Sequence, residues 1–165
     1  MQEFRGPLPA AIRRVVDDRG RLNALAALAQ PAGETDGDFD RLSRTAARLF
    51  HAEFGFIALV DADGQLLQGV HGASPEGVTD ANFAAYTLGA TAGEVLFVPD
   101  TTIDPRFAES PLVTGSERVR FFAGVPITYS GHRLGALCVL GTSPQAGVSP
   151  EINEQMFDLA ALAST

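Results

Sequence analysis

The chain has 165 residues, of which 45% are apolar, and carries a formal charge of −8 at pH 7. This length supports one domain with a single core, and the acidic charge opposes sequence-independent binding to nucleic acid, which depends on neutralising phosphates. The twelve basic residues are all arginine and Cys138 is the one cysteine, which excludes lysine-dependent Schiff-base and P-loop enzymes, internal disulfides and cysteine-based zinc sites.

Residues 1–30 have the apolar spacing of helices, interrupted at Gly20, and contain five arginines. A basic helix on a membrane surface is one interpretation, but Asp17 and Asp18 interrupt the basic face and favour a solvated or self-associating leader helix. No apolar run reaches the roughly 18 residues of a membrane span and no signal-peptide region is present. We therefore expect a cytoplasmic protein without membrane or nucleic-acid partners, with a leader over residues 1–20 and one domain over residues 21–165.

The first half of the predicted domain contains a loop, a helix and a hairpin. Residues 31–37 form a loop by composition, and an amphipathic helix follows from Phe39 to Phe50 with Asp36 or Asp38 as its cap. Residues 54–60 are a dense β-type run. Residues 61–64 then form a hairpin turn, and residues 65–70 form the returning strand.

The second half alternates short elements with strands. Residues 72–93 are small and polar, with a short helix near residues 80–88, and residues 95–98 form a third strand. A turn at residues 104–107 precedes two more strands, residues 118–127 and 134–140, joined by a hairpin-like connection. A last helix begins at Ser149, which caps it ahead of Pro150, and continues to the final residue without a stop signal. This ending suggests a fragment of a longer signalling protein, or a helix that pairs with a partner.

The order of these elements predicts an α+β fold. Tight connections between strand pairs imply a central antiparallel sheet of five to six strands. We expect the N- and C-terminal helices on one face of this sheet. Loops and short helices would cover a ligand cavity on the other face.

Seven blocks of the sequence occur in a distinctive order. They are Phe39-Asp40-Arg41-Leu42 with Ala46 and Leu49, Ile57-Ala58-Leu59-Val60-Asp61, Val98-Pro99-Asp100, Asp104-Pro105-Arg106-Phe107, Pro111-Leu112-Val113, Arg120-Phe121-Phe122-Ala123-Gly124-Val125-Pro126-Ile127 and Gly135-Ala136-Leu137-Cys138-Val139. These blocks resemble the GAF domain family, whose architecture is related to that of PAS domains. The resemblance covers residues 21–163, and the chain is similar to the branch of the family found ahead of bacterial histidine kinases and diguanylate cyclases.

Departures from the family pattern argue against the best-known ligands and reactions of GAF domains. Where that branch has an aromatic–cysteine pair, this chain has Asn82-Phe83-Ala84-Ala85, which argues against a covalent bilin. The family's signature for binding cyclic nucleotides requires a lysine, which this chain lacks. GAF-fold methionine sulfoxide reductases need more than one cysteine, and Cys138, in an apolar strand, is interpreted as core.

The resemblance directs attention to residues that would line a ligand cavity. Arg120 alternates with Phe122 along one predicted strand, where it could grip a carboxylate or phosphate, or lie at the rim paired with an acidic residue. Asp100 could point into the cavity or cap the following turn. The aromatic candidates could line the cavity mouth or serve as core. The full predicted set is Phe83, Tyr86, Asp100, Phe107, Arg120, Phe122 and Val139.

No spacing in the sequence forms a metal site or a catalytic set. The three histidines, His51, His71 and His132, are scattered, and haem ligation by His71 has no supporting motif. The resemblance implies a non-catalytic domain that senses a small molecule, and its cofactor is unidentified. We expect it to form a homodimer through residues 22–29 and 152–163 and to signal to an output module or partner protein. A ligand-free dimerisation or interaction module is the alternative, and an enzyme is the weakest reading.

Overall fold

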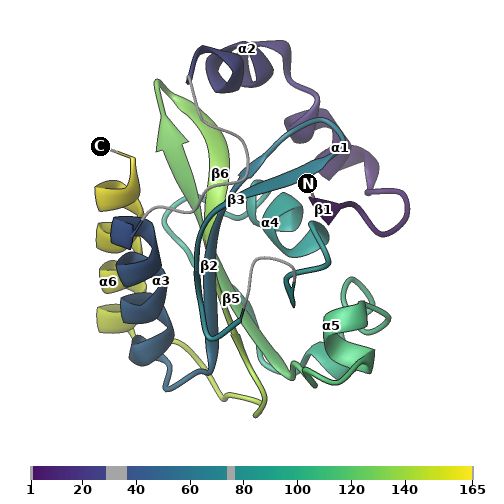
Figure 1. Ribbon diagram of the computed structural model, residues 1–165, viewed down its shortest axis with the longest axis vertical. Helices are drawn as coiled ribbons and strands as arrows, with labels where there is room; N and C mark the ends of the chain where they lie inside the picture. The colour runs from purple at the N-terminus through teal and green to yellow at the C-terminus, as the bar shows by residue number, and fades with distance from the viewer. Residues whose placement is uncertain (1, 29–36, 74–76, 165) are drawn as a thin grey trace.

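A single antiparallel sheet organises the fold, as the sequence predicted. The computed structural model describes residues 2–28, 37–73 and 77–164, and it contains a six-stranded sheet in the order β1-β3-β2-β6-β5-β4 (Figure 1). Neighbouring strands pair antiparallel throughout. The strands are β1 (Gln2–Glu3), β2 (Phe54–Val60), β3 (Gly64–His71), β4 (Leu96–Val98), β5 (Phe121–Tyr129) and β6 (His132–Gly141).

Local turn chemistry sets the register of the two central hairpins. Between β5 and β6, Ser130 and Gly131 have φ values of 52° and 78°, and this pair of positive φ angles matches the twist of antiparallel strands. Between β2 and β3, the amide of Asp61 donates to the carbonyl oxygen of Gly64 at 2.7 Å. Both turns lie where the sequence predicted them.

Two long helices, α3 (Gly37–Leu49) and α6 (Pro150–Ala163), lie side by side on one face of the sheet (Figure 1). The Ser149 hydroxyl accepts from the Ile152 amide at 3.1 Å, so the predicted cap of α6 is confirmed. Asp38 lies inside the first turn of α3, and Asp36 lies outside the described residues. We call the packing on this face the helix-side core; it includes Ala46, Phe50, Ile57, Phe121, Leu137 and Met156.

Short elements cover the opposite face, also as predicted. They are α1 (Ala10–Val16), α4 (Asn82–Thr87), the 3₁₀ helix η2 (Thr101–Ile103) and α5 (Pro111–Thr114). We call this packing the α4-side core; it includes Phe56, Leu67, Phe83, Leu88, Phe107 and Phe122.

The placement of the first helix differs from the prediction that the N-terminal helices share a face with the last one. Val16 of α1 is fully buried in the α4-side core, where Ile12 also packs. The chain then turns at Asp18, whose carboxylate accepts from the Arg21 amide at 2.9 Å and caps α2 (Arg19–Ala27). The sequence predicted an interruption at Gly20, and the structure places it two residues earlier, at this cap.

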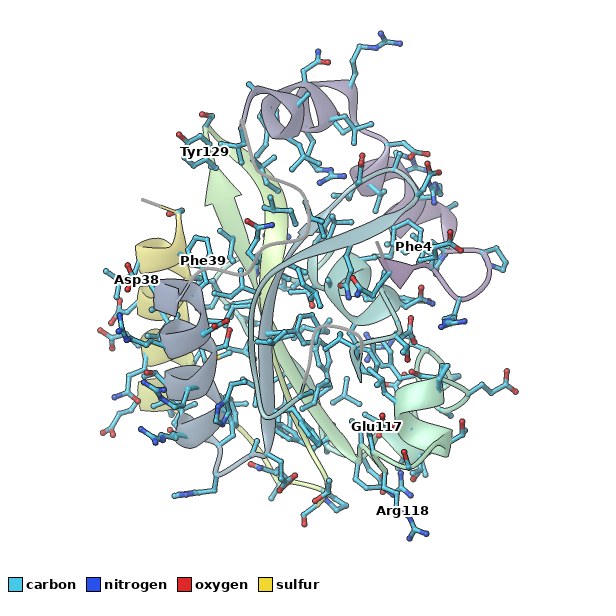
Figure 2. The ribbon with its side chains drawn as sticks, in the orientation of Figure 1. Phe4, Asp38, Phe39, Glu117, Arg118 and Tyr129 are labelled. Atoms are coloured by element: carbon cyan, nitrogen blue, oxygen red, sulfur yellow. The ribbon has the colours of Figure 1, made fainter. Side chains whose placement is uncertain are left out.

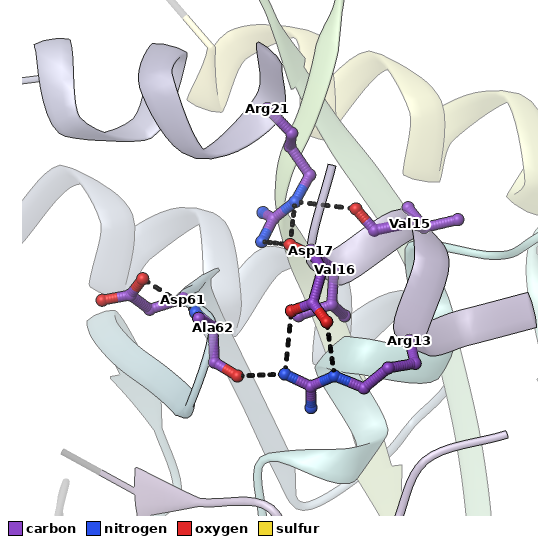
Figure 3. A network of polar contacts seen from close by, with 7 residues as sticks. All are labelled: Arg13, Val15, Val16, Asp17, Arg21, Asp61 and Ala62. Atoms are coloured by element: carbon purple, nitrogen blue, oxygen red, sulfur yellow. Dashed lines mark hydrogen bonds and ion pairs between the residues drawn. The ribbon is translucent and has the colours of Figure 1, made fainter. Parts of the chain in front are cut away.

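The predicted leader packs as part of the domain rather than beside it. β1 pairs with β3, and Leu8 and Val16 are buried. Arg21 is only 2% exposed, and its guanidinium donates to the carbonyl oxygens of Val15 and Val16 (Figure 3). Arg21 of the basic segment is therefore held by internal hydrogen bonds. Among the described residues, no helix combines the length and apolarity needed to cross a membrane.

Candidate ligand-binding face

Four aromatic rings predicted to line a cavity meet in the α4-side core. Phe83 of α4 stacks on Phe107 with ring centroids 4.4 Å apart and planes 5° apart. Phe122 of β5 lies 4.9 Å from Phe83 and 5.5 Å from Phe107, and Tyr86 meets Phe107 edge-on at 5.2 Å. The three phenylalanines are at most 1% exposed, so the rings fill the space between α4 and β5.

Close backbone packing holds α4 against the sheet behind these rings. A Cβ atom on Gly124 of β5 would lie 2.6 Å from the Thr87 hydroxyl, so glycine is what lets α4 approach the strand. The Thr87 hydroxyl also donates to the Phe83 carbonyl oxygen at 2.7 Å. Phe83, near the start of the short helix, is thus bonded to Thr87, the residue at its end that lies against β5.

Arg120 does not make the contacts predicted for a rim ion pair. Its Nη1 donates to the carbonyl oxygens of Val113 and Val119, both at 2.9 Å, which ties the end of α5 to the chain entering β5. Arg120 itself precedes the strand, which begins at Phe121. A role as ligand anchor stays a prediction.

Asp100 adopts the capping alternative. Its carboxylate accepts from the Thr102 hydroxyl at 2.6 Å and from the Thr102 amide at 3.0 Å, which together lower the pKa of Asp100. Nearby Asp104 binds Arg106 at 2.7 Å, and the Arg106 guanidinium lies 5.4 Å from the centre of the Phe107 ring. At this edge Asp104 and Arg106 therefore bind each other, and Arg106 lies against the ring of Phe107.

Val139 lies on the opposite face of the sheet from Phe122, so the structure does not bring these two members of the predicted set together. Val139 is buried in the helix-side core, whereas Phe122 is buried in the α4-side core. The register explains this: Ala123 is opposite Val139 and Phe122 is opposite Leu140. Because side chains alternate along a strand, Val139 and Phe122 point to opposite sides of the sheet.

The cysteine and histidine environments give no sign of a reactive centre in the described part of the chain. Cys138 is fully buried, and burial raises the pKa of its thiol, as the core interpretation predicted. His71, at the end of β3, borders a cavity of about 20 Å³, and burial lowers its pKa, helped by Arg44 and Arg48. No group of three or more metal-ligating side chains occurs among the residues that the structure describes.

Two buried polar groups on this face escaped the sequence analysis. Asp80 is 1% exposed and its carboxylate accepts from the Asn82 amide at 2.8 Å and from the Ser110 hydroxyl. Burial nevertheless raises the pKa of Asp80. Gln65 of β3 is fully buried, and neither its Oε1 nor its Nε2 has a hydrogen-bond partner. The residues next to Asp80 and Gln65 in the sequence do not alternate between polar and apolar in a way that predicts that these two side chains point inward.

A larger cavity lies on the other face. It has a volume of about 200 Å³ and is lined mostly by apolar side chains, among them Phe39, Ile57, Ile127 and Leu134. The sequence predicted the cavity on the α4 face, where the aromatic cluster lies instead.

A sequence model of the GAF domain matches residues 34–165, which is most of the chain. The chain belongs to the GAF domain family. Its sheet with two long helices on one face and short elements on the other agrees with that assignment.

Solved structures support the GAF fold at low sequence identity. The GAF domain of phosphoenolpyruvate-protein phosphotransferase from Acinetobacter has a TM-score of 0.60 at 22% identity, covering 93% of this chain and 88% of that one. A domain of a putative two-component sensor histidine kinase from Sinorhizobium meliloti has a TM-score of 0.56 at 13% identity, covering 79% and 88%. These similarities establish the fold alone.

A curated relative is similar at a higher sequence identity. The cyclic di-GMP phosphodiesterase PA2567 of Pseudomonas aeruginosa is 33% identical over 113 residues, which are 67% of this chain and 19% of that protein. The chain therefore spans about a fifth of the length of this relative.

Proposed function

We propose that this GAF domain is a non-catalytic regulatory module that senses a small molecule and transmits its presence to an output module of a bacterial signalling protein. The observation that carries the proposal is the single sheet between two unlike layers. Short elements and loops pack on one side, and the long helices α3 and α6 pack on the other.

The alternation of β5 supports communication between these layers. Phe122 is packed in the α4-side core, while its neighbours Phe121 and Ala123 are packed in the helix-side core. A shift of this strand on ligand binding would change the packing of both sides, because close-packed cores do not deform freely. The free energy of ligand binding would then bias the position of α6.

The terminal helices are the proposed route to the output. Of the predicted segment 22–29, residues 22–27 belong to α2 and residue 29 lies outside the described residues. These residues of α2 and residues 152–163 of α6 would contact a second copy of the chain or the output module. A histidine kinase or a diguanylate cyclase would suit such a module, and the name of the curated relative adds a cyclic di-GMP phosphodiesterase to these choices.

The test begins with the purified protein's intact mass under non-denaturing conditions, followed by a thermal-shift screen of small molecules. We expect a retained or exchangeable ligand, and slower hydrogen exchange in α6 once it is bound. Failure of every compound to shift the melting temperature, together with unchanged exchange in α6, would overturn the sensor proposal.

The proposed anion anchor can be tested within the same screen. If Arg120 grips an anionic ligand, the Arg120→Ala variant should lose the thermal shift that this ligand causes. Arg118→Ala, two residues away and exposed, is the matched control and should keep the shift. Equal shifts in both variants would remove Arg120 from the site.

A ligand-free interaction module is the second candidate, and one observation favours it. The rings of Phe83, Phe107 and Phe122 occupy the space in which a ligand was predicted. On this alternative the purified chain would retain no ligand and show no thermal shift, yet would dimerise with increasing concentration in light scattering.

A further inference from the structure

The fully buried amide of Gln65 is the least explained polar group in the described part of the chain. It is 0% exposed, and its Oε1 and Nε2 both lack a hydrogen-bond partner. Val60 is opposite Gln65 on β2, and Leu67 is two residues along β3; both belong to the α4-side core. Gln65 therefore presents an unpaired donor and acceptor to apolar surroundings, an arrangement that folded proteins rarely keep without a reason.

The segment beside Gln65 at the edge of the sheet is residues 2–8, which we call the N-terminal strap. β1 within the strap pairs Gln2 with Gln65 and Glu3 with Gly64 at the edge of the sheet. Phe4 packs against the α4-side core from this segment (Figure 2), and Leu8 is buried in the same core. The strap thus places Gln2 opposite Gln65 and adds the apolar side chains of Phe4 and Leu8 to the core on the side toward which Gln65 points.

Few contacts hold the strap in place. Only two residue pairs join it to β3, and Glu3, Arg5, Gly6 and Pro7 are exposed. Other hydrogen bonds join it to the residues at the start of α4. The Arg5 amide donates to Asn82 Oδ1 at 3.0 Å, Asn82 Nδ2 donates to the Arg5 carbonyl oxygen at 3.4 Å and the Ala81 amide donates to the Glu3 carbonyl oxygen at 3.2 Å. The Arg5 guanidinium donates to the Thr79 carbonyl oxygen at 2.8 Å and 3.0 Å. Exposed hydrogen bonds and a two-residue strand open at low free energy compared with the core strands.

We propose that Gln65 is the polar anchor of a binding site for a neutral molecule bearing a carboxamide, lactam or imide, which enters when the N-terminal strap lifts from β3. An amide offers a donor beside an acceptor, and these groups present the complementary pair in one plane. The apolar surroundings favour a neutral group, because an unpaired charge placed there would lose its hydration. The proposal rests on the proposed function, since it assigns the site at which the domain would sense its ligand.

The strap also connects such a site to α4. Arg5 binds Asn82, the first residue of α4, and Phe83 next to it begins the aromatic cluster. Lifting the strap would release that end of the helix and loosen Phe83 from Phe107. Ligand binding at Gln65 would therefore change the packing of β5, the strand that contributes side chains to both cores.

The experiment uses the full ¹⁵N-labelled chain with nicotinamide, 2-pyridone and uracil as probes. The side-chain amide signals of Gln65 are assigned through their own carbon connectivities and checked by their absence in Gln65→Met. We expect at least one probe to shift these signals in the wild type. Arg5→Ala, which removes the bonds to Thr79, should tighten binding at least threefold, whereas Arg48→Ala on the exposed face of α3 should not.

Matched variants on one strand separate an anchor from a structural residue. Gln65→Met should melt no lower than the wild type, because an apolar side chain replaces an unpartnered amide, and should lose probe binding. Gln68→Met is the control, since Gln68 borders the cavity beside Phe39 on the other face; it should retain binding. Equal probe affinities in Gln65→Met and the wild type would overturn the anchor role.

The remaining outcomes distinguish this site from the proposed function. If no probe moves the Gln65 signals in the wild type or in Arg5→Ala, or if only a trapped water contacts the amide, the site is overturned. A different ligand that binds both the wild type and Gln65→Met equally would leave the sensor proposal standing without this site. Probe binding at Gln65 that leaves hydrogen exchange in α6 unchanged would support the site and count against transmission.

Discussion

Phe107 lies at the centre of the aromatic packing on the α4 face. Its ring contacts those of Phe83, Tyr86 and Phe122, at centroid distances of 4.4, 5.2 and 5.5 Å. It comes from an irregular segment and not from a helix or strand. The stability of that segment therefore depends on one side chain inserted between α4 and β5.

Replacing this ring should destabilise the domain strongly. We expect Phe107→Ala to lower the free energy of unfolding by about 3–5 kcal/mol, because it removes buried area and leaves a cavity between rigid neighbours. Urea denaturation measures this. Ile103→Ala is the control, since Ile103 is 80% exposed nearby and should change stability by less than about 0.5 kcal/mol. Similar effects of the two substitutions would contradict the packing described for Phe107.

Asp80 should give the domain a pH dependence opposite to that of its surface acids. Burial raises the pKa of Asp80 above its ordinary value of 3.8. Between that value and the raised native pKa the folded state binds more protons than the unfolded state, so this group's contribution to stability falls as pH rises. The carboxylates of Asp17 and Asp104 have lowered pKa values and lose their contribution as pH falls.

The Asp80→Asn variant isolates that contribution, because its side chain stays neutral at every pH. We expect the stability of the variant relative to the wild type to increase between pH 3.5 and pH 7. Urea unfolding of both proteins at the two pH values provides the measurement. A relative stability that is constant, or that decreases with pH, would show that Asp80 is not held above its ordinary pKa.

The face to which each strand residue points was only partly predictable. β6 is apolar at nearly every position because both of its faces are covered, so no alternation shows that Val139 and Cys138 point in opposite directions. Gln65 was hidden for a related reason: Leu66 and Leu67 follow it, and either could have been the inward residue. The aromatic residues were correctly predicted as buried candidates, because large rings seldom stay in water.

At the scale of elements, the position of α4 depends on one glycine in β5. Gly124 lies beneath Thr87, and a Cβ there would approach the Thr87 hydroxyl to 2.6 Å and the tip of the Phe122 ring to 2.8 Å. Neither neighbour is free to move, because Thr87 is bonded to Phe83 and Phe122 is packed in the aromatic cluster. The helix can lie this close to the strand only if the strand has no side chain there.

Gly124→Ala should therefore push α4 outward and lower the free energy of unfolding by about 1–3 kcal/mol, the usual effect of overpacking a core. Gly147→Ala is the control, since nothing lies within 4 Å of a Cβ at Gly147. Chemical denaturation compares the two. Adding Thr87→Ala to Gly124→Ala should recover part of the loss in a double-mutant cycle. Strictly additive effects would mean that α4 and β5 are not in the contact described.

Elements with strong local signals were predicted well. The hairpin β2–β3 and the capped helix α6 follow from apolar runs bounded by turn or cap residues. The start of β5 was predicted three residues early, because Arg118 adopts a φ of 52° that no sequence pattern reveals. β1 was missed, since two residues have no periodicity and its pairing partner, β3, is about sixty residues away.

At the scale of the molecule, the sheet is shared by two cores that cannot repack independently. The central strands β2, β6 and β5 contribute side chains to both. A sensor built this way needs no hinge between domains, because a displacement on the α4 side is already a displacement of the strands under α3 and α6.

The brevity of β1 and β4 has a consequence for solubility. These two edge strands contain two and three residues, so they themselves offer little backbone with which another chain could pair. Removing residues 1–8 would uncover the end of β3 at Gly64 and Gln65, so that all eight residues of that strand lie at the edge of the sheet. We expect the truncated chain to self-associate edge to edge, seen as concentration-dependent mass in light scattering, where the intact chain shows none through this edge. A few residues at the edge of the sheet would then determine whether the folded protein self-associates at cellular concentrations.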